Sequence, residues 1–327
     1  MTLETFFLSA PLKPAALHIP DGFLSTWVAI AGWVVAVLVI AVALRQSRAQ
    51  LGERQIPLLG VMAAFIFAAQ AINFPVAGGT SGHLLGGALA AIVLGPWAAL
   101  LVMASVIGLQ ALLFQDGGLL ALGWNIVNMG VLTAFTGALL YRLARRLLGP
   151  SRTSIMVAGV VGAWLSVEAG AIATALQLAV SGTAPLGIVL PAMAGVHALI
   201  GVGEALITVG ALLLLAASRP DLLVMGEQAP GTRAAGWVAT GLLAALVVAG
   251  LSFLASPAPD GLERVAMDSG FIDAALDPLF QVLPDYTIPF IGHETLAGVT
   301  AVVLGTVLVF ALVIGLGRAL RRPPVSR

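Results

Sequence analysis

The sequence contains no cysteine, and Asp, Glu, Lys and Arg together make up only 9% of its 327 residues. Without cysteine there is no disulfide, no thiolate metal site and no cysteine nucleophile, so any metal ligand must be nitrogen or oxygen. Lys13 is the only lysine and lies outside any Gly-x-x-x-x-Gly-Lys loop, which excludes ATP hydrolysis by that route. The net charge is zero and no basic face exists, so we expect no nucleic-acid partner.

Apolar residues, in contrast, make up 60% of the chain, more than an ordinary soluble domain carries. Apolar stretches of about 18 to 30 residues recur, and each could cross a hydrocarbon core of about 30 Å as a helix. We expect spans at residues 27–45, 57–74, 84–114, 121–144, 154–180, 187–217, 235–255 and 297–318. The composition therefore predicts an all-α polytopic membrane protein in contact with lipid.

Four arginine clusters indicate the orientation, because short Arg-rich loops stay on the cytoplasmic side. The clusters are Arg45, Arg48 and Arg54; Arg142, Arg145, Arg146 and Arg152; Arg219 and Arg233; and Arg318, Arg321 and Arg322. If all lie inside, residues 84–114 cross twice or not at all. As one helix this stretch would be about 46 Å long, and Gly95-Pro96 breaks it. We therefore expect about nine transmembrane helices, with the N-terminus outside and the C-terminus in the cytoplasm.

Between the last two spans, residues 256–294 carry seven acidic side chains against Arg264 alone. The orientation places this segment outside as a small extracytoplasmic loop domain. A polar linker at 219–234 separates it and its flanking spans from the rest. We expect four parts: an extension at 1–16, a membrane domain at 17–218, a cytoplasmic linker at 219–234 and a module at 235–327 whose two transmembrane helices flank the acidic loop.

Two histidines occur in glycine-rich or proline-rich turns on the predicted outer side. His18 opens the turn His-Ile-Pro-Asp-Gly-Phe, and His83 follows a glycine-rich loop that starts at Asn73. Their imidazoles could share one metal ion, oriented by neighbouring polar side chains, or both segments could simply be tight turns that cap helices. The candidate orienting residues are Asp21, Asn73, Thr80 and Ser81.

His197 and Glu204 lie seven residues apart, near one face of a predicted span. A charge at that depth costs about 2.5 to 3.5 kcal/mol, so the pair either forms interhelical hydrogen bonds or has a function. With Glu168 it could form the proton or cation relay of an ion-coupled secondary transporter. Ser81 and His83 also suggest a membrane serine hydrolase, although neighbours two apart rarely place nucleophile and base correctly.

Several motifs together resemble the CbiM/NikM family, the nickel and cobalt substrate-binding (S) components of energy-coupling-factor transporters, a class of ABC transporter. The motifs are His18-Ile-Pro-Asp-Gly-Phe-Leu-Ser25, the Asn73–Gly87 stretch, Gln110–Leu119, Trp124–Met129 and His197–Thr208. The module at 235–327 resembles the family's small companion subunit, of CbiN or NikN type, through Pro259-Asp-Gly-Leu-Glu263 and Leu283-Pro-Asp-Tyr286.

The resemblance implies a multi-pass protein of the inner (cytoplasmic) membrane that captures Ni²⁺ or Co²⁺ as a transported ion. It implies no prosthetic group and no enzymatic activity of its own. The partners would be a transmembrane coupling subunit and two ATP-binding subunits. Family habit implies a square-planar site made by the α-amine of Leu17, the amide and imidazole nitrogens of His18, and His83. Fusion to the companion module favours nickel.

The chain departs from the family in one respect: sixteen residues precede Leu17, so the amine of residue 17 lies within a peptide bond. We expect the mature chain to begin at Leu17, through cleavage after Ala15-Ala16 or through an alternative start codon. If the extension is retained, a side chain or water must replace the amine.

Overall fold

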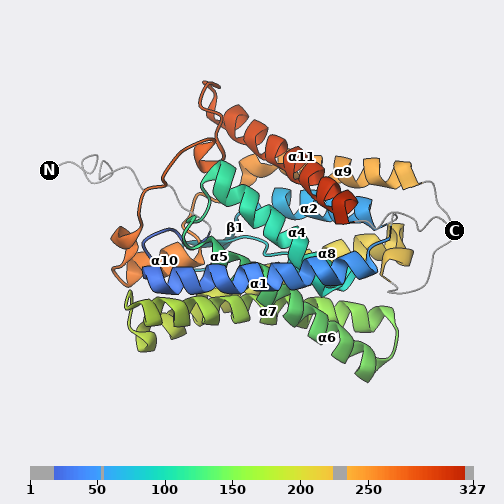
Figure 1. Cartoon of the computed structure of the whole chain (residues 1–327), viewed down its shortest axis with the longest axis horizontal. Coiled ribbons are helices and arrows are strands. Elements are labelled where there is room, and N and C mark those ends of the chain that lie inside the picture. The colour runs from blue at the N-terminus through green and yellow to red at the C-terminus, as the bar shows by residue number, and fades with distance from the viewer. Residues whose placement is uncertain (1–17, 53–54, 224–233, 321–327) are drawn as a thin grey trace.

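The computed structural model describes residues 18–52, 55–223 and 234–320. Within them the chain is mostly helical, with one short antiparallel hairpin that pairs Phe74 with Gly82 and Val76 with Thr80 (Figure 1). The main elements are α1 (Thr26–Gln50), α2 (Ile56–Gln70), β1 (Phe74–Val76), β2 (Thr80–Gly82), α3 (Gly87–Leu94), α4 (Pro96–Leu109), α5 (Leu122–Asn125), α6 (Thr133–Leu148), α7 (Arg152–Ser181), α8 (Leu186–Ser218), α9 (Ala234–Gly250), α10 (Gly261–Asp268) and α11 (Glu294–Leu320). Two π-helical segments, η2 (Gln110–Phe114) and η3 (Ile126–Leu132), extend α4 and join α5 to α6. Short 3-10 turns are η4 (Pro220–Leu222), η5 (Ser252–Leu254), η6 (Ile272–Ala274) and η7 (Pro284–Tyr286). The predicted all-α membrane fold is confirmed.

Seven helical stretches of the described chain are long and apolar enough to cross a membrane. They are Thr26–Ala49, Pro96–Phe114, Leu122–Leu148, Arg152–Ser181, Leu186–Ser218, Gly236–Leu254 and Glu294–Leu320. The predicted count of about nine is reached only by adding α2, of 15 residues, and α3, of 8. A helix as short as α3 is about 12 Å long, so α3 does not cross a hydrocarbon core by itself.

The predicted break in the 84–114 stretch lies where expected. Gly95, with φ of 81°, ends α3 and Pro96 begins α4, which suits proline because the first helical N–H has no partner within the helix. Both sides of this helix pair reach the same end of the bundle: the Ser81 amide donates to the Pro259 carbonyl, and the Tyr286 hydroxyl donates to Asp116. The stretch therefore enters the bundle and turns back.

The helix ends that adjoin the arginine clusters gather at one end of the bundle. Figure 1 shows the C-terminal ends of α1, α6, α8 and α11 on the right, whereas α10 and the loop around it lie on the left. The arginines of these clusters that belong to the described residues therefore lie toward one end of the bundle.

Small residues let the helices approach closely, as expected for packing in lipid. A Cβ at Gly137 of α6 would lie 2.6 Å from Cα of Ala88 in α3, and a Cβ at Gly305 of α11 would lie 2.2 Å from the Phe67 ring in α2. The second contact joins the C-terminal module to the membrane domain, since α9 and α11 both pack against α2.

The acidic segment folds back over the left end of the bundle as short helical pieces. Asp260 caps α10, because its carboxylate accepts a hydrogen bond from the Glu263 amide. Backbone hydrogen bonds attach the segment to the membrane domain: Leu276 donates to the carbonyl of Asp21, and Leu283 donates to that of Leu113. The module therefore covers the region that holds His18.

Candidate metal-binding site

The segment that carries His18 is fixed by hydrogen bonds from α5. The Ile19 amide donates to Oδ1 of Asn125 at 3.1 Å, and Nδ2 of Asn125 donates back to the Ile19 carbonyl at 3.1 Å. One side chain therefore satisfies both backbone polar groups of a buried residue. This double contact holds the backbone next to His18 in one position.

Asp21 fixes the other end of the same turn. Its carboxylate accepts three backbone hydrogen bonds, from Leu119 at 3.0 Å and from Leu120 and Ala121 at 2.8 and 3.1 Å. These amides precede α5, where a negative charge is favoured. Asp21 was predicted to orient an imidazole, but its hydrogen bonds hold the loop opposite His18.

The His18 imidazole is buried and held by the residue that sequence reasoning had not singled out, Asp116. Nδ1 lies 3.1 Å from the Asp116 carbonyl and 3.4 Å from Oδ1 of its carboxylate. Because a carbonyl only accepts, Nδ1 carries the hydrogen and Nε2 carries the lone pair. Nε2 is buried and has no hydrogen-bond partner among the described residues. A buried acceptor without a partner is costly, so Nε2 is a donor atom available to a ligand.

His83 meets His18 across the site. It lies just after β2, in the irregular segment that leads into α3, and is 7% exposed. The two ring centroids are 5.8 Å apart with an interplanar angle of 79°. Nδ1 of His83 donates to the Leu84 carbonyl at 3.0 Å, so Nε2 is again the nitrogen with the lone pair.

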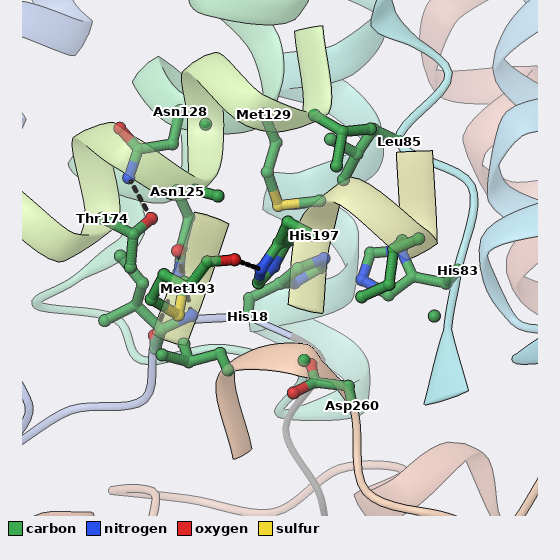
Figure 2. Close-up of a pocket in the computed structure, with 18 residues that line it drawn as sticks. His18, His83, Leu85, Asn125, Asn128, Met129, Thr174, Met193, His197 and Asp260 are labelled. Atoms are coloured by element: carbon green, nitrogen blue, oxygen red, sulfur yellow. Dashed lines mark hydrogen bonds between the residues drawn. The ribbon is translucent and has the colours of Figure 1, made fainter. Parts of the chain in front are cut away.

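A third histidine lines the same pocket. Nδ1 of His197 donates to the Met193 carbonyl at 2.7 Å, one turn earlier in α8. Figure 2 shows the His197 side chain beside those of His18 and His83, with Asp260 of the C-terminal module at the edge of the pocket. The cavity is small, about 70 Å³. His197 had been predicted to share a face with Glu204, and the structure gives the two different partners.

Glu204 supports the segment that follows His83. Its two carboxylate oxygens accept hydrogen bonds from the amides of Leu85 at 2.6 Å and Gly86 at 2.9 Å. Glu168 lies elsewhere, on α7, with Oε1 buried and without a hydrogen-bond partner in the described chain. The three residues proposed as a relay therefore do not form one hydrogen-bonded chain in the described structure.

The remaining candidate residues lie around the loop that leads to His83. Ser81 donates its hydroxyl to the carbonyls of Ala258 and Pro259, at 2.7 and 3.3 Å, and so attaches the module beside the pocket. Thr80 is buried in β2, and Asn73 lines a separate, larger cleft. The Ser81 hydroxyl is thus directed at backbone carbonyls, which removes the geometric basis for a hydrolase.

Asp260 is the acidic group nearest this pocket from the module. It is buried, and burial raises the pKa of its carboxyl to about 8, with the nearby carboxylates of Glu263 and Asp116 adding to the effect. The next residue, Gly261, is required because a Cβ there would lie 2.8 Å from Cε1 of His197. The Asp-Gly pair of the module is therefore fitted to the histidine pocket.

Side chains alone supply few metal ligands here. Within the described ranges, no three His, Cys, Asp or Glu side chains gather as ligands of one ion. Two imidazoles need further donors from backbone nitrogens or water to complete a plane. The predicted ligand Leu17 lies outside the described residues, as does the extension at 1–16.

Both parts of the chain match known protein families, one in the membrane domain and one in the C-terminal module. Residues 18–222 match the CbiM family, described as the cobalt uptake substrate-specific transmembrane region, and residues 235–322 match the PDGLE domain. The putative fused nickel transport protein NikMN of Archaeoglobus fulgidus is 36% identical over 93% of this chain and 99% of its own length. The cobalt transport protein CbiM of Sorangium cellulosum is 36% identical over 63% of this chain and 91% of its own length. The crystal structure of a truncated transition metal transporter matches with a TM-score of 0.56 and 32% identity, over 61% of this chain and 98% of that one.

Proposed function

The chain belongs to the CbiM family, with a PDGLE domain fused behind it, and we propose that it is the substrate-capture subunit of an ATP-driven nickel or cobalt uptake transporter. Membership makes it a membrane component of metal transport rather than an enzyme. In this proposal residues 17–218 bind the ion, and residues 235–327, connected by the linker at 219–234, form an accessory module over the site.

The observation that carries the proposal is the convergence of His18 and His83. Two sequence segments, one before α1 and one before α3, bring buried imidazole rings to a centroid distance of 5.8 Å. Each ring presents Nε2 as its lone-pair nitrogen because a backbone carbonyl engages Nδ1. Neutral imidazole is a preferred ligand of nickel and cobalt, and no thiolate competes because cysteine is absent.

Backbone nitrogens are proposed to complete the ligand set. The family resemblance assigns the amine of Leu17 and the amide of His18. An amide and a ring nitrogen of one histidine chelate a single ion through Nδ1, because Nε2 lies on the far side of the ring. Since Nδ1 contacts Asp116, that chelate requires the His18 ring to leave Asp116, whereas an ion shared through Nε2 does not. The complete plane further requires a free amine at residue 17, which N-terminal sequencing tests.

We place the ion at the outer face of the cell's inner membrane. The pocket lies near α10 and the acidic loop, whereas the described arginines of the four clusters lie toward the opposite end of the bundle (Figure 1). In this orientation the N-terminus and the PDGLE loop are outside and the C-terminus is cytoplasmic. Since the chain has no phosphate-binding loop, a transmembrane coupling subunit and two ATP-binding subunits would drive transport, as the resemblance implies.

Nickel is our preferred substrate. The relative from Archaeoglobus fulgidus that shares both parts of this chain is named a fused nickel transport protein. An all-nitrogen plane also suits the geometry that Ni²⁺ accepts. Cobalt is the competing ion in any test.

The test is uptake of radioactive nickel by cells that express the chain with or without the partner subunits. We expect uptake only with the ATP-binding partners, loss of uptake in His83→Ala, and normal uptake in His293→Ala. His293 is the matched control because it is exposed and its Nδ1 accepts a hydrogen bond only from the nearby Leu296 amide. Uptake that persists without the ATP-binding partners would instead support a secondary transporter that uses His197, Glu204 and Glu168.

A further inference from the structure

The two most exposed large apolar side chains of the described residues lie in the loop of the C-terminal module. Leu279 is 82% exposed and Phe290 is 87% exposed, and the nearby Phe280 and Val282 are 43% and 47% exposed. Large apolar groups that gather on a surface mark contact with a protein or a membrane. The loop at residues 276–290 thus exposes more apolar surface than water favours.

The end of α9 indicates the depth of this loop relative to a membrane. The apolar stretch Gly236–Leu254 has 19 residues, and as a helix it is about 28 Å long, close to the roughly 30 Å of a hydrocarbon core. When this stretch crosses the membrane, its last residues lie at a boundary of that core. Phe253, at this end, is 57% exposed and lines the larger cleft together with Leu279 and Phe280. The loop therefore reaches the depth of the membrane boundary.

The start of α11 leads to the same boundary from the other end of the loop. This helix packs against η5, and its residues Thr295 and Val299 line the same cleft as Phe253. Phe290 precedes the first residue of α11 by four positions, and Leu296 in the first turn is 57% exposed. Figure 1 shows the chain that leads into α11 project from the bundle above the start of that helix. The apolar surface of the loop is thus continuous with the lipid-facing sides of α9 and α11.

We propose that this loop rests in the lipid bilayer, with Leu279 and Phe290 inserted at the boundary between headgroups and acyl chains. Segments that lie in this boundary bury Phe and Leu side chains and keep polar side chains in the headgroup layer. The neighbours of the two inserted residues fit that arrangement, because Asp277, Gln281 and His293 are polar and exposed. The partner of this surface is therefore lipid.

Insertion gives the loop a second attachment. The Leu276 amide donates to the Asp21 carbonyl and the Leu283 amide donates to the Leu113 carbonyl, which fixes one side of the loop to the membrane domain. Lipid holds the other side, so the module stays at the membrane surface while it covers the histidine pocket. The inference does not depend on which ion the chain binds, because it needs only that α9 and α11 cross the membrane.

The test places one fluorescent label at each position in the full chain, reconstituted in lipid nanodiscs. Because the sequence has no cysteine, Leu279→Cys and Phe290→Cys each take a single bimane label. Both side chains are highly exposed, so their replacement leaves the packing unchanged. Leu304→Cys, on the exposed side of α11, is the lipid-facing control, and Asp268→Cys, on α10, is the water-exposed control.

Two quenchers distinguish lipid from water around each label. With lipids whose acyl chains are brominated, we expect bimane fluorescence to fall at positions 279 and 290, as at position 304, and to stay constant at position 268. Iodide dissolved in the buffer should quench the label at position 268 most strongly. Fluorescence at position 279 or 290 that follows position 268 with both quenchers would overturn the inference, since that residue would then face water.

Discussion

Three histidines in this protein share one hydrogen-bonding pattern. In His18, His83 and His197 a backbone carbonyl accepts the hydrogen of Nδ1, so each neutral ring has its lone pair on Nε2. Since lone-pair nitrogens bind metal and N–H groups do not, backbone geometry determines how these side chains can act. Residue type alone indicated candidate ligands, whereas the tautomer follows from contacts with distant parts of the chain.

Asp260 gives a pH-dependent prediction at the residue scale. Its carboxyl pKa is about 3.8 when the module is undocked and about 8 when burial holds it against the pocket. A raised pKa favours the protonated form, so the docking contribution is full below about pH 4, falls by about 1.4 kcal/mol for each pH unit above that, and is lost once the pH passes about 8. We expect the melting temperature of the metal-free chain to fall between about pH 5 and about pH 8 and then to level off.

The control for this prediction is the exposed carboxylate of Asp268, on the same helix as the cap. Asp260→Asn keeps a cap that accepts the Glu263 amide and should remove most of the decrease in melting temperature, whereas Asp268→Asn should retain it. The same decrease between about pH 5 and about pH 8 in Asp260→Asn would show that another group is responsible.

Only part of the site could be predicted from the sequence, because several of its residues act through contacts with distant parts of the chain. His18 and His83 are recognisable because imidazoles next to proline and glycine turns are unusual in so apolar a chain. Asp116, Asn125 and Tyr286 act through contacts with residues about a hundred or more positions away in the sequence, which no local pattern reveals. Their motifs had been noted as family signatures, but their roles required the fold.

At the scale of elements, irregular backbone is concentrated where the site is built. The irregular segment before α3, the short α3 itself and the π-helical segments η2 and η3 all adjoin residues of the pocket or of the loop at 116–121. Non-helical backbone at such a depth is tolerated in membrane proteins when it is buried in protein and its polar groups are satisfied. Glu204 meets this requirement, because its carboxylate accepts hydrogen bonds from the amides of Leu85 and Gly86.

Glu204→Gln tests this support of the segment after His83. The substitution replaces one acceptor oxygen with an amide donor that faces a backbone N–H, and an unpaired buried donor costs about 1 to 3 kcal/mol. We expect a lower melting temperature and weaker nickel binding, measured by competition with a chelator. Glu168→Gln is the matched control, because Oε1 of Glu168 has no hydrogen-bond partner in the described chain, and it should bind nickel normally. Unchanged nickel binding in Glu204→Gln would contradict the assigned role.

Element boundaries were predicted well where apolar runs are long and poorly where they are short. The spans expected at 154–180 and 187–217 correspond to α7 and α8 within a few residues, because caps and charges mark their ends. The 84–114 stretch was expected to form two short spans. Only the break at Gly95-Pro96 was predictable, since apolar composition does not show that residues 84–86 are not helical and that α3 is only 8 residues long.

At the scale of the whole molecule, the fusion joins two parts that share one site. The module contributes Asp260 and Gly261 to the histidine pocket and Tyr286 to the network behind His18. The family resemblance inferred from short motifs is confirmed for both parts. The sequence predicted the module's two membrane helices and acidic loop, but not that the loop folds over the histidine pocket, because apolar periodicity does not specify docking of irregular segments.

The most direct test of this account is X-ray absorption spectroscopy of the nickel-loaded full chain beside its His18→Ala and His83→Ala variants. The account predicts a ligand shell of nitrogen atoms with the outer scattering of two imidazole rings, and the loss of bound nickel or of one ring in each variant. A shell dominated by water oxygen, identical in all three proteins, would contradict the claim that these two histidines share one ion.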